Sequence, residues 1–211
     1  MQEKLSGINS VREALNGSRK VHRIYVLKER QDNRLQEIIA LARTRGIKIE
    51  EASRQQLEQL AGNDWHQGVV ARVEAYPYVS VEDIIERAAK RAEPPFIIIL
   101  DGLEDPQNLG AIIRTAECAG VHGVIIPKDR AVDVTPAVVR ASAGAVEHIP
   151  VARVSNLVNV IKDLKKQGMW VIGADMNGSK DHYSVDIPRP VAIVIGSEGK
   201  GIRRLVKENC D

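Results

Sequence analysis

The sequence predicts an α/β protein with two parts, a small N-terminal α/β module and a larger domain built on a parallel β-sheet. From residue 95 onward, short apolar runs alternate with helix-like segments, which is the pattern of strand–helix–strand units. Residues 1–75 hold a separate set of alternating elements, and a helix in residues 76–94 separates the two parts. Hydrophobic residues form 44% and charged residues 27% of the chain, as in ordinary folded domains.

The N-terminal module is expected to be compact and close to the lower size limit for independent folding. β-Rich runs and helical periodicity predict the order strand, helix, strand, helix, strand. Ser53 and Gln56 form a capping box at the start of the second helix. The expected elements are residues 21–27, 32–45, 47–52, 53–62 and 68–76.

Residues 76–94 are expected to form a linker or bridging helix. Ser80 is its predicted N-cap. Pro94 and Pro95 end it, because proline is poorly tolerated inside a helix and restricts the residue before it. The domain boundary is therefore expected between Tyr76 and Pro95.

The larger domain, residues 95–211, contains five apolar runs that predict strands buried on both faces. Three helices are expected between them, capped by Asp105, Thr135 and Ser155. Ligands on such sheets bind at the carboxyl ends of the strands, so the loops after these ends are candidates for the functional site. The expected strands are residues 96–102, 121–127, 149–154, 169–175 and 190–196.

The first candidate loop runs from Asp101 to Gly120 and enters a helix. Asn108 lies in the first turn of that helix, and Gly110 and Arg114 are four residues apart and share a face. Glycine lowers the stability of a helix by up to about 1 kcal/mol relative to alanine. A close approach by backbone or ligand would explain why glycine stands at position 110 despite this cost. Arg114 could hold a phosphate through its fixed guanidinium fork. The alternative is a surface arginine on an ordinary crossover helix.

The second candidate loop is IVIGSEGKGI, residues 193–202. Three glycines around Glu198 allow a tight turn and bring backbone amides near a ligand. The order of residues matches neither a Walker A loop nor a Rossmann fingerprint. The segment GADMNGSK, residues 173–180, has serine and lysine in the wrong order for a phosphate loop and is interpreted as a plain loop.

Together the two loops resemble a known family. The spacing of Asn108, Gly110 and Arg114 resembles the first motif of the SpoU (TrmH-type) RNA methyltransferases, and IGSEGKGI, residues 195–202, resembles their second motif. GINSVREAL, residues 7–15, and WHQGVVARV, residues 65–73, resemble the small RNA-binding module of RlmB-like members. The resemblance covers nearly the whole chain.

This resemblance implies a SPOUT-type trefoil-knot domain that acts as a homodimer and uses S-adenosyl-L-methionine to methylate a ribose 2′-hydroxyl. It implies a catalytic set of Asn108, Arg114 and Glu198, with Arg114 central. Cofactor binding falls to Ala174, Gly196, Ser197 and Gly199. The implied substrate is a guanosine of large-subunit ribosomal RNA, with transfer RNA as the alternative.

The ending departs from the family pattern. Members continue into a third motif that completes the cofactor pocket, whereas this sequence stops at Asp211. A truncated methyltransferase domain, an incomplete knot and weak cofactor binding are therefore expected. A non-catalytic RNA-binding homologue and a small-molecule enzyme on a doubly wound sheet remain alternatives.

Charge and composition limit the classes of partner expected for this chain. Net charge is +2; residues 1–75 carry 13 Lys/Arg against 10 Asp/Glu, and residues 95–211 carry 14 of each. A mildly basic front segment fits RNA contact, while aromatic residues at 3% argue against a base-stacking platform. Two cysteines and five scattered histidines predict no metal site. With no apolar span or signal peptide, a cytoplasmic protein without a membrane partner is expected.

Overall fold

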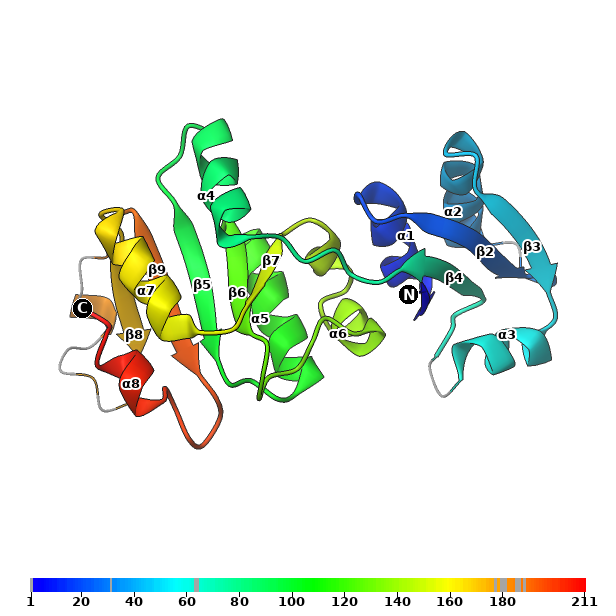
Figure 1. Cartoon of the computed structure of the whole chain (residues 1–211). Helices are drawn as coiled ribbons and strands as arrows, with labels where there is room; N and C mark the ends of the chain where they lie inside the picture. The colour runs from blue at the N-terminus through cyan, green and yellow to red at the C-terminus, as the bar shows by residue number, and fades with distance from the viewer. Residues whose placement is uncertain are drawn as a thin grey trace. The chain divides into compact units, whose positions relative to one another are not determined.

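The computed structural model describes residues 2–30, 32–62, 65–176, 178, 182–184, 187 and 189–211. The chain divides into two compact units (Figure 1). The first unit is Met1–Pro77 together with Val134–His148, and the second is Tyr78–Asp133 together with Ile149–Asp211. The segment Val134–His148 thus belongs to the N-terminal unit, although the sequence pattern puts it inside residues 95–211.

The first unit is built on a four-stranded sheet in the order β1-β4-β2-β3. β4 is antiparallel to β1 and to β2, while β2 and β3 are parallel. The sheet confirms the strands expected in this module and adds β1, which the sequence pattern did not predict. The strands are β1 (Gln2–Ser6), β2 (Val21–Leu27), β3 (Lys48–Ala52) and β4 (Val69–Glu74).

Helices cover both faces of this sheet, with α1 and α2 on one side and α3 on the other (Figure 1). Successive side chains of β4 point to opposite faces of the sheet, as strand geometry requires. Val70 packs against Leu57 of α3, so its neighbours in the strand point to the opposite face. The Ser53–Gln56 capping box at the start of α3 is confirmed. The helices are α1 (Ile8–Asn16), α2 (Asn33–Thr44), α3 (Arg54–Ala61) and the short α6 (Pro136–Ala141).

Buried charges attach the α6 segment to the N-terminal residues. The Arg19 guanidinium lies 3.3 Å from the Glu147 carboxylate and 3.5 Å from that of Glu3, and its own side chain is 1% exposed. Burial raises the pKa of Glu147, although the Arg19 charge opposes this. A second pair, His148 Nε2 with Glu13 Oε2 at 2.8 Å, lies at the end of the same segment.

The second unit contains a five-stranded sheet in the order β7-β6-β5-β9-β8, and every neighbouring pair is parallel. All five strands coincide with the five predicted apolar runs to within two residues at each end, so the predicted parallel α/β fold is confirmed. They are β5 (Phe96–Asp101), β6 (Gly123–Pro127), β7 (Val151–Val154), β8 (Trp170–Ala174) and β9 (Val191–Gly196).

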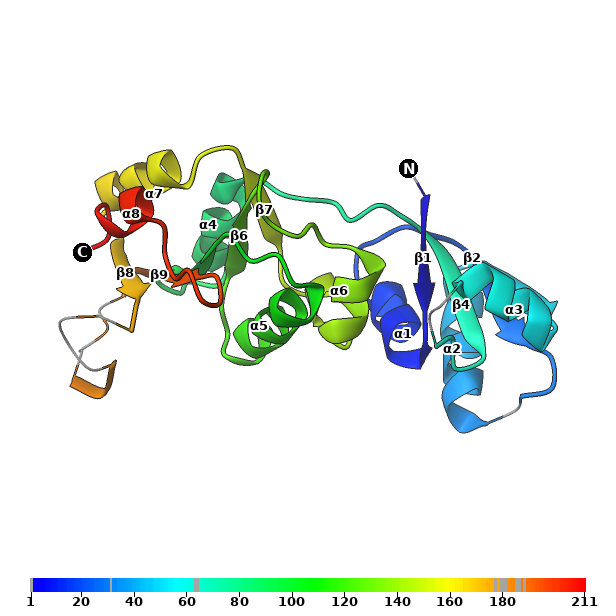
Figure 2. The same cartoon turned by 90° about the horizontal axis from the view of Figure 1, so that it is seen from below.

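Helices α7 and α8 cover one face of this sheet, and α5 covers the other (Figure 2). Ile84 of α4 lies in the same core cluster as Ile161 of α7 and Val206 of α8, so α4 is packed on the domain. The N-cap of α7 is Asn156, which corrects the predicted Ser155. The helices are α4 (Val81–Lys90), α5 (Pro106–Cys118), α7 (Leu157–Lys166) and α8 (Arg204–Lys207). Within the described residues, no helix has the length and hydropathy needed to cross a membrane.

The packing of α4 on β6 gives a first prediction. A Cβ on Gly123 would lie 2.6 Å from Ile84 Cδ1 and Cγ1 and 2.7 Å from Ile84 Cγ2. Gly123→Ala should therefore destabilise the protein by about 1–3 kcal/mol through overpacking, measured by urea denaturation.

Ile84→Ala removes the clashing atoms and serves as the matched test. The double variant should lose less stability than the two single variants lose together. Simple additivity would contradict the predicted contact.

Candidate functional site

The candidate site lies where the parallel strands of the second unit end. β5 and β9 are neighbours, and their register puts Asp101 opposite Gly196. On the other side of β9, Ala174 of β8 pairs with Ile195. The two loops singled out from the sequence therefore leave adjacent strands at the same edge of the sheet, where ligands of such folds bind.

The loop after β9 folds back on itself. Ser197 and Gly201 exchange two backbone hydrogen bonds, with Gly201 N donating to Ser197 O at 2.9 Å and Ser197 N donating to Gly201 O at 3.2 Å. A Cβ on Gly196 would lie 2.1 Å from the Gly201 carbonyl carbon. Glycine is therefore required at 196 by its own returning backbone, and Gly199, at φ +77°, forms the tip of the loop.

A buried carboxylate holds this loop against β5. Asp101 is 1% exposed, and its Oδ2 accepts a hydrogen bond of 2.7 Å from the Arg203 backbone amide. Arg203 Nε donates to Asp101 Oδ1 at 2.7 Å, and Arg203 Nη2 lies 2.6 Å from the same oxygen. Sequence reasoning missed this pair. An acid at the end of the apolar strand FIIILD and an arginine just after the glycine loop were the available signals.

The residues of the first motif lie on α5, which starts beyond the end of β5. Asn108 is half-buried in the first turn, and Gly110 is buried against the sheet. Arg114 is exposed and lies about 12 Å along the helix from its start. Among the described residues, the side chains of Asn108, Arg114 and Glu198 form no hydrogen bond or ion pair with one another or with other groups.

The residues of the second motif share the exposed edge. Glu198 and Gly199 are exposed, and Gly196 and Ser197 are partly exposed. Ala174 is also exposed at the end of β8. The structure therefore brings the predicted cofactor residues to the ends of two paired strands, and it leaves their outward surface open.

The loop and α8 are tied to β8 by further charges. Lys207 Nζ lies 3.0 Å from Asp175 Oδ2, and Lys165 Nζ lies 2.6 Å from Asp211 Oδ1. Partial burial works to raise the pKa of Asp211, but the hydrogen bonds from Lys165 and Val171 outweigh it and lower that pKa. Burial raises the pKa of the Cys210 thiol, which disfavours its thiolate.

A cavity of about 830 Å³ lies beside this edge, at the ends of β6 and β7. Arg203 is shared between the cavity wall and the Asp101 ion pair, but none of the predicted site residues lines the cavity. The site inferred from the motifs and this cavity are thus adjacent but distinct. Among the described residues, no three His, Cys, Asp or Glu side chains gather as metal ligands would.

Comparison with known proteins identifies the fold and the motifs together. Residues 95–211 match the model of the SpoU rRNA Methylase family, and residues 5–79 match that of the RNA 2′-O ribose methyltransferase substrate-binding domain. The chain belongs to the SpoU rRNA methylase family. The resemblance inferred from the sequence motifs is confirmed.

Curated relatives match nearly the whole length of the chain. A protein of Bacillus subtilis named putative TrmH family tRNA/rRNA methyltransferase YacO is 47% identical over 97% of this chain and 82% of its own length. The 23S rRNA (guanosine-2′-O-)-methyltransferase RlmB of Shewanella oneidensis is 39% identical over 100% of this chain and 85% of its own.

Solved structures of SpoU-type enzymes have the same fold. An rRNA methyltransferase from Sinorhizobium meliloti is 27% identical with a TM-score of 0.79, covering 99% of this chain and 76% of that one. The SpoU methyltransferase AviRb from Streptomyces viridochromogenes, in complex with AdoMet, has a TM-score of 0.80 at 24% identity, over 100% of this chain and 78% of that one.

The Asp101–Arg203 pair gives the prediction for this site. Arg203→Ala removes the Nε and Nη2 contacts of a buried carboxylate and leaves it the backbone amide, so it should lower the free energy of unfolding by about 2 kcal/mol. Urea denaturation measures the change.

Arg204→Ala is the matched control, because Arg204 is exposed and forms a surface ion pair with Glu208, four residues away. That change should cost less than about 0.5 kcal/mol. Equal losses for the two variants would mean that the buried pair does not hold the loop.

Proposed function

We propose that this chain transfers the methyl group of S-adenosyl-L-methionine to a ribose 2′-hydroxyl of RNA. The observation that carries the proposal is the pairing of β5 with β9, with Asp101 opposite Gly196. This pairing puts the start of the Asn108–Arg114 helix and the Glu198 loop at one edge of the sheet. Membership of the SpoU rRNA methylase family supports the same reaction.

The cofactor fits the edge formed by Ala174, Gly196, Ser197 and Gly199. Nothing lies within 4 Å of where a Cβ on Gly199 would be, and Ala174 is small and exposed. Backbone groups at the loop tip are thus open to a ligand. When bound, S-adenosyl-L-methionine supplies an electrophilic methyl group on a sulfonium.

The reaction forms a bond between the ribose oxygen and the methyl carbon and breaks the sulfur–carbon bond, so that the sulfur leaves with the electron pair as a neutral thioether and the hydroxyl proton passes to water. A guanidinium is ordinarily too basic to act as the general base, so we give Arg114 a different role. We assign it to a phosphate or ribose oxygen of the RNA, to which its N–H groups donate. Asn108 and Glu198 form no hydrogen bond or ion pair with Arg114 among the described residues, and we propose that they orient it and shape the site around the attacking hydroxyl once RNA is bound.

For the substrate we propose a guanosine of large-subunit ribosomal RNA. The name of the Shewanella relative, a 23S rRNA guanosine methyltransferase at 39% identity, supports this choice. The Bacillus relative is named for transfer and ribosomal RNA, which makes transfer RNA the second candidate. We propose that residues 1–75 bind the RNA substrate and that residues 76–94 link this module to the methyltransferase domain. Residues 95–211 form that domain, of the trefoil-knot type, and carry out the reaction in a homodimer.

Ala174 tests the cofactor assignment. Ala174→Leu adds bulk at the end of β8 and should weaken binding of S-adenosyl-L-methionine at least tenfold in calorimetry. The matched control is Ala89→Leu, at an exposed position of α4. Equal affinities for the two variants would place the cofactor elsewhere.

Arg114 tests the catalytic assignment. Arg114→Ala should reduce transfer of labelled methyl to total RNA by at least about 100-fold while leaving cofactor affinity unchanged, because the guanidinium acts on the RNA. Glu117→Gln alters an exposed charge one turn further along α5 and should retain activity.

Mapping the methylated nucleotides of total RNA decides the substrate. A single 2′-O-methylguanosine in large-subunit RNA is the expected product, and a mark in transfer RNA would select the second candidate. RNA binding without transfer, with the cofactor bound, would favour a non-catalytic homologue.

A further inference from the structure

A second cavity, of about 380 Å³, lies in the N-terminal unit, and none of the residues assigned to methyl transfer lines it. Its wall combines an aromatic ring, two guanidinium groups, an imidazole and a carboxylate. The end of β2, the start of α3 and the turn before β4 supply these groups. The lining residues are Leu27, Arg30, Arg54, Glu58, Trp65, His66, Gln67 and Gly68.

The tryptophan is the unusual member. Trp65 is 82% exposed, although an indole buries a large apolar area in most proteins. A nearly bare indole at the mouth of a cavity leaves both its face and its N–H available. Every nucleobase has a π-face that such a ring can stack on, whatever the base sequence.

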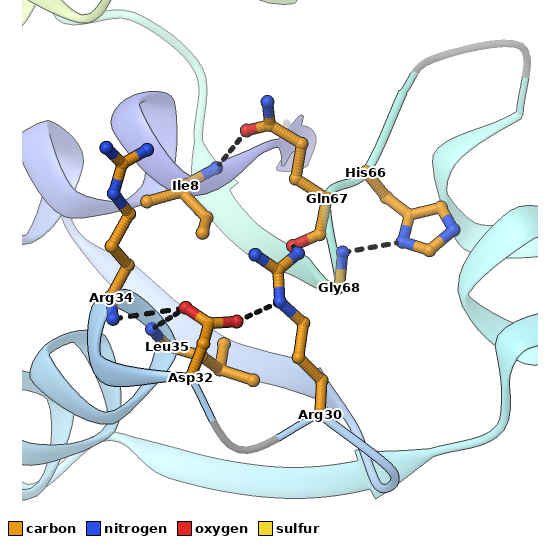
Figure 3. A network of polar contacts seen from close by, with 8 residues as sticks. All are labelled: Ile8, Arg30, Asp32, Arg34, Leu35, His66, Gln67 and Gly68. Carbon is orange, nitrogen blue, oxygen red and sulfur yellow. Dashed lines mark hydrogen bonds and ion pairs between the residues drawn. The ribbon is translucent and has the colours of Figure 1, made fainter.

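The turn that carries Trp65 is held by α1 and by the Arg30 side chain. Gln67 Oε1 accepts a hydrogen bond from the Ile8 amide at 3.0 Å, which ties the turn to α1. Arg30 lies between the Asp32 carboxylate and the Gln67 carbonyl oxygen, to which its Nη1 donates at 2.6 Å (Figure 3). A Cβ on Gly68 would lie 2.8 Å from Arg30 Cδ, so the backbone closely approaches that side chain.

The polar groups of the wall present donors and an acceptor. His66 Nδ1 accepts from the Gly68 amide at 3.0 Å (Figure 3), so the neutral ring carries its proton on Nε2 and can donate there. Arg54 is 78% exposed at its side chain, and its contact with Glu58 is a weak surface pair at 3.2 Å. A phosphate can replace Glu58 as the partner of Arg54 at little cost. Glu58 is then free to accept from a base amine.

We propose that this cavity holds one unpaired nucleotide of the RNA substrate, with its base stacked on Trp65 and its phosphate on Arg54. The mixed wall favours a nucleotide over a bare phosphate, because Glu58 lies inside it and Asp32 pairs with Arg30. The inference rests on the proposed action on RNA and adds single-stranded character to the substrate. Stacking of a single base requires one exposed ring, which Trp65 supplies.

Intrinsic fluorescence gives a direct readout. The chain contains two tryptophans, Trp65 and Trp170, so Trp170→Phe leaves Trp65 as the reporter. A short single-stranded oligoribonucleotide of mixed sequence should quench its emission, and a duplex of the same sequence should quench it much less. In the Trp65→Phe protein, the emission of Trp170 should stay constant. Unchanged Trp65 emission, or equal quenching by duplex, would overturn the proposal.

Affinity and salt dependence separate stacking from charge. Trp65→Ala should weaken binding of the oligoribonucleotide about tenfold with an unchanged salt slope, and Trp65→Phe should restore most of it. Arg54→Ala should lower the slope of log K against log salt by about 0.7, because one phosphate contact is lost. Wild-type affinity in Trp65→Ala would refute the stacked base.

Methyl transfer assays keep the two proposals apart. Loss of transfer in Arg114→Ala with unchanged Trp65 quenching supports separate sites for chemistry and base stacking. Transfer by the wild-type protein combined with no quenching would overturn the Trp65 inference alone. Quenching without any transfer would overturn the proposed function alone.

Discussion

The buried carboxylate of Asp101 is the constraint on which the functional edge depends. A carboxylate taken out of water must be matched by donors, and the backbone amide and the guanidinium of Arg203, a residue 102 positions away in the chain, supply them. Satisfying Asp101 therefore fixes where the loop after β9 returns. The same return puts the backbone of Gly201 against Gly196, so that only glycine fits there. Loop shape, strand register and the start of α8 all follow from one polar group at the end of β5.

The two units meet different physical demands. The second unit buries both faces of a parallel sheet, and its proposed chemical groups, Arg114 and Glu198, extend from an otherwise apolar scaffold into solvent. Neither is tied to a neighbour within the described residues, so RNA and cofactor can engage them without first breaking an internal ion pair. In the first unit, polar contacts are used instead to hold a turn still, and the Trp65 ring is left exposed on a fixed backbone.

Trp65 shows that composition does not report how exposed an aromatic ring is. The low aromatic content of 3% argued against base stacking, but it counts rings and says nothing of their exposure. Trp65 is the first residue of the segment WHQGV, whose functional interpretation came from its resemblance to the RNA-binding module of RlmB-like members. Its histidine, glutamine and glycine each form a contact that orients the turn, with Gly68, Ile8 and Arg30 respectively. A single well-placed ring on such a turn offers the stacking surface that a larger aromatic platform would supply.

Local features were predictable from the sequence by itself: the five apolar strands of the parallel sheet, the capping boxes and the glycine loop around Glu198. Each depends on residues only a few positions apart, so a short stretch of sequence is enough to predict it. The tertiary structure decided what depends on distant residues. It added β1, packed residues 134–148 on Arg19 and Glu13, and paired Asp101 with Arg203. The partner of a buried charge is determined by tertiary packing, and the spacing of residues along the sequence does not indicate which residue it will be.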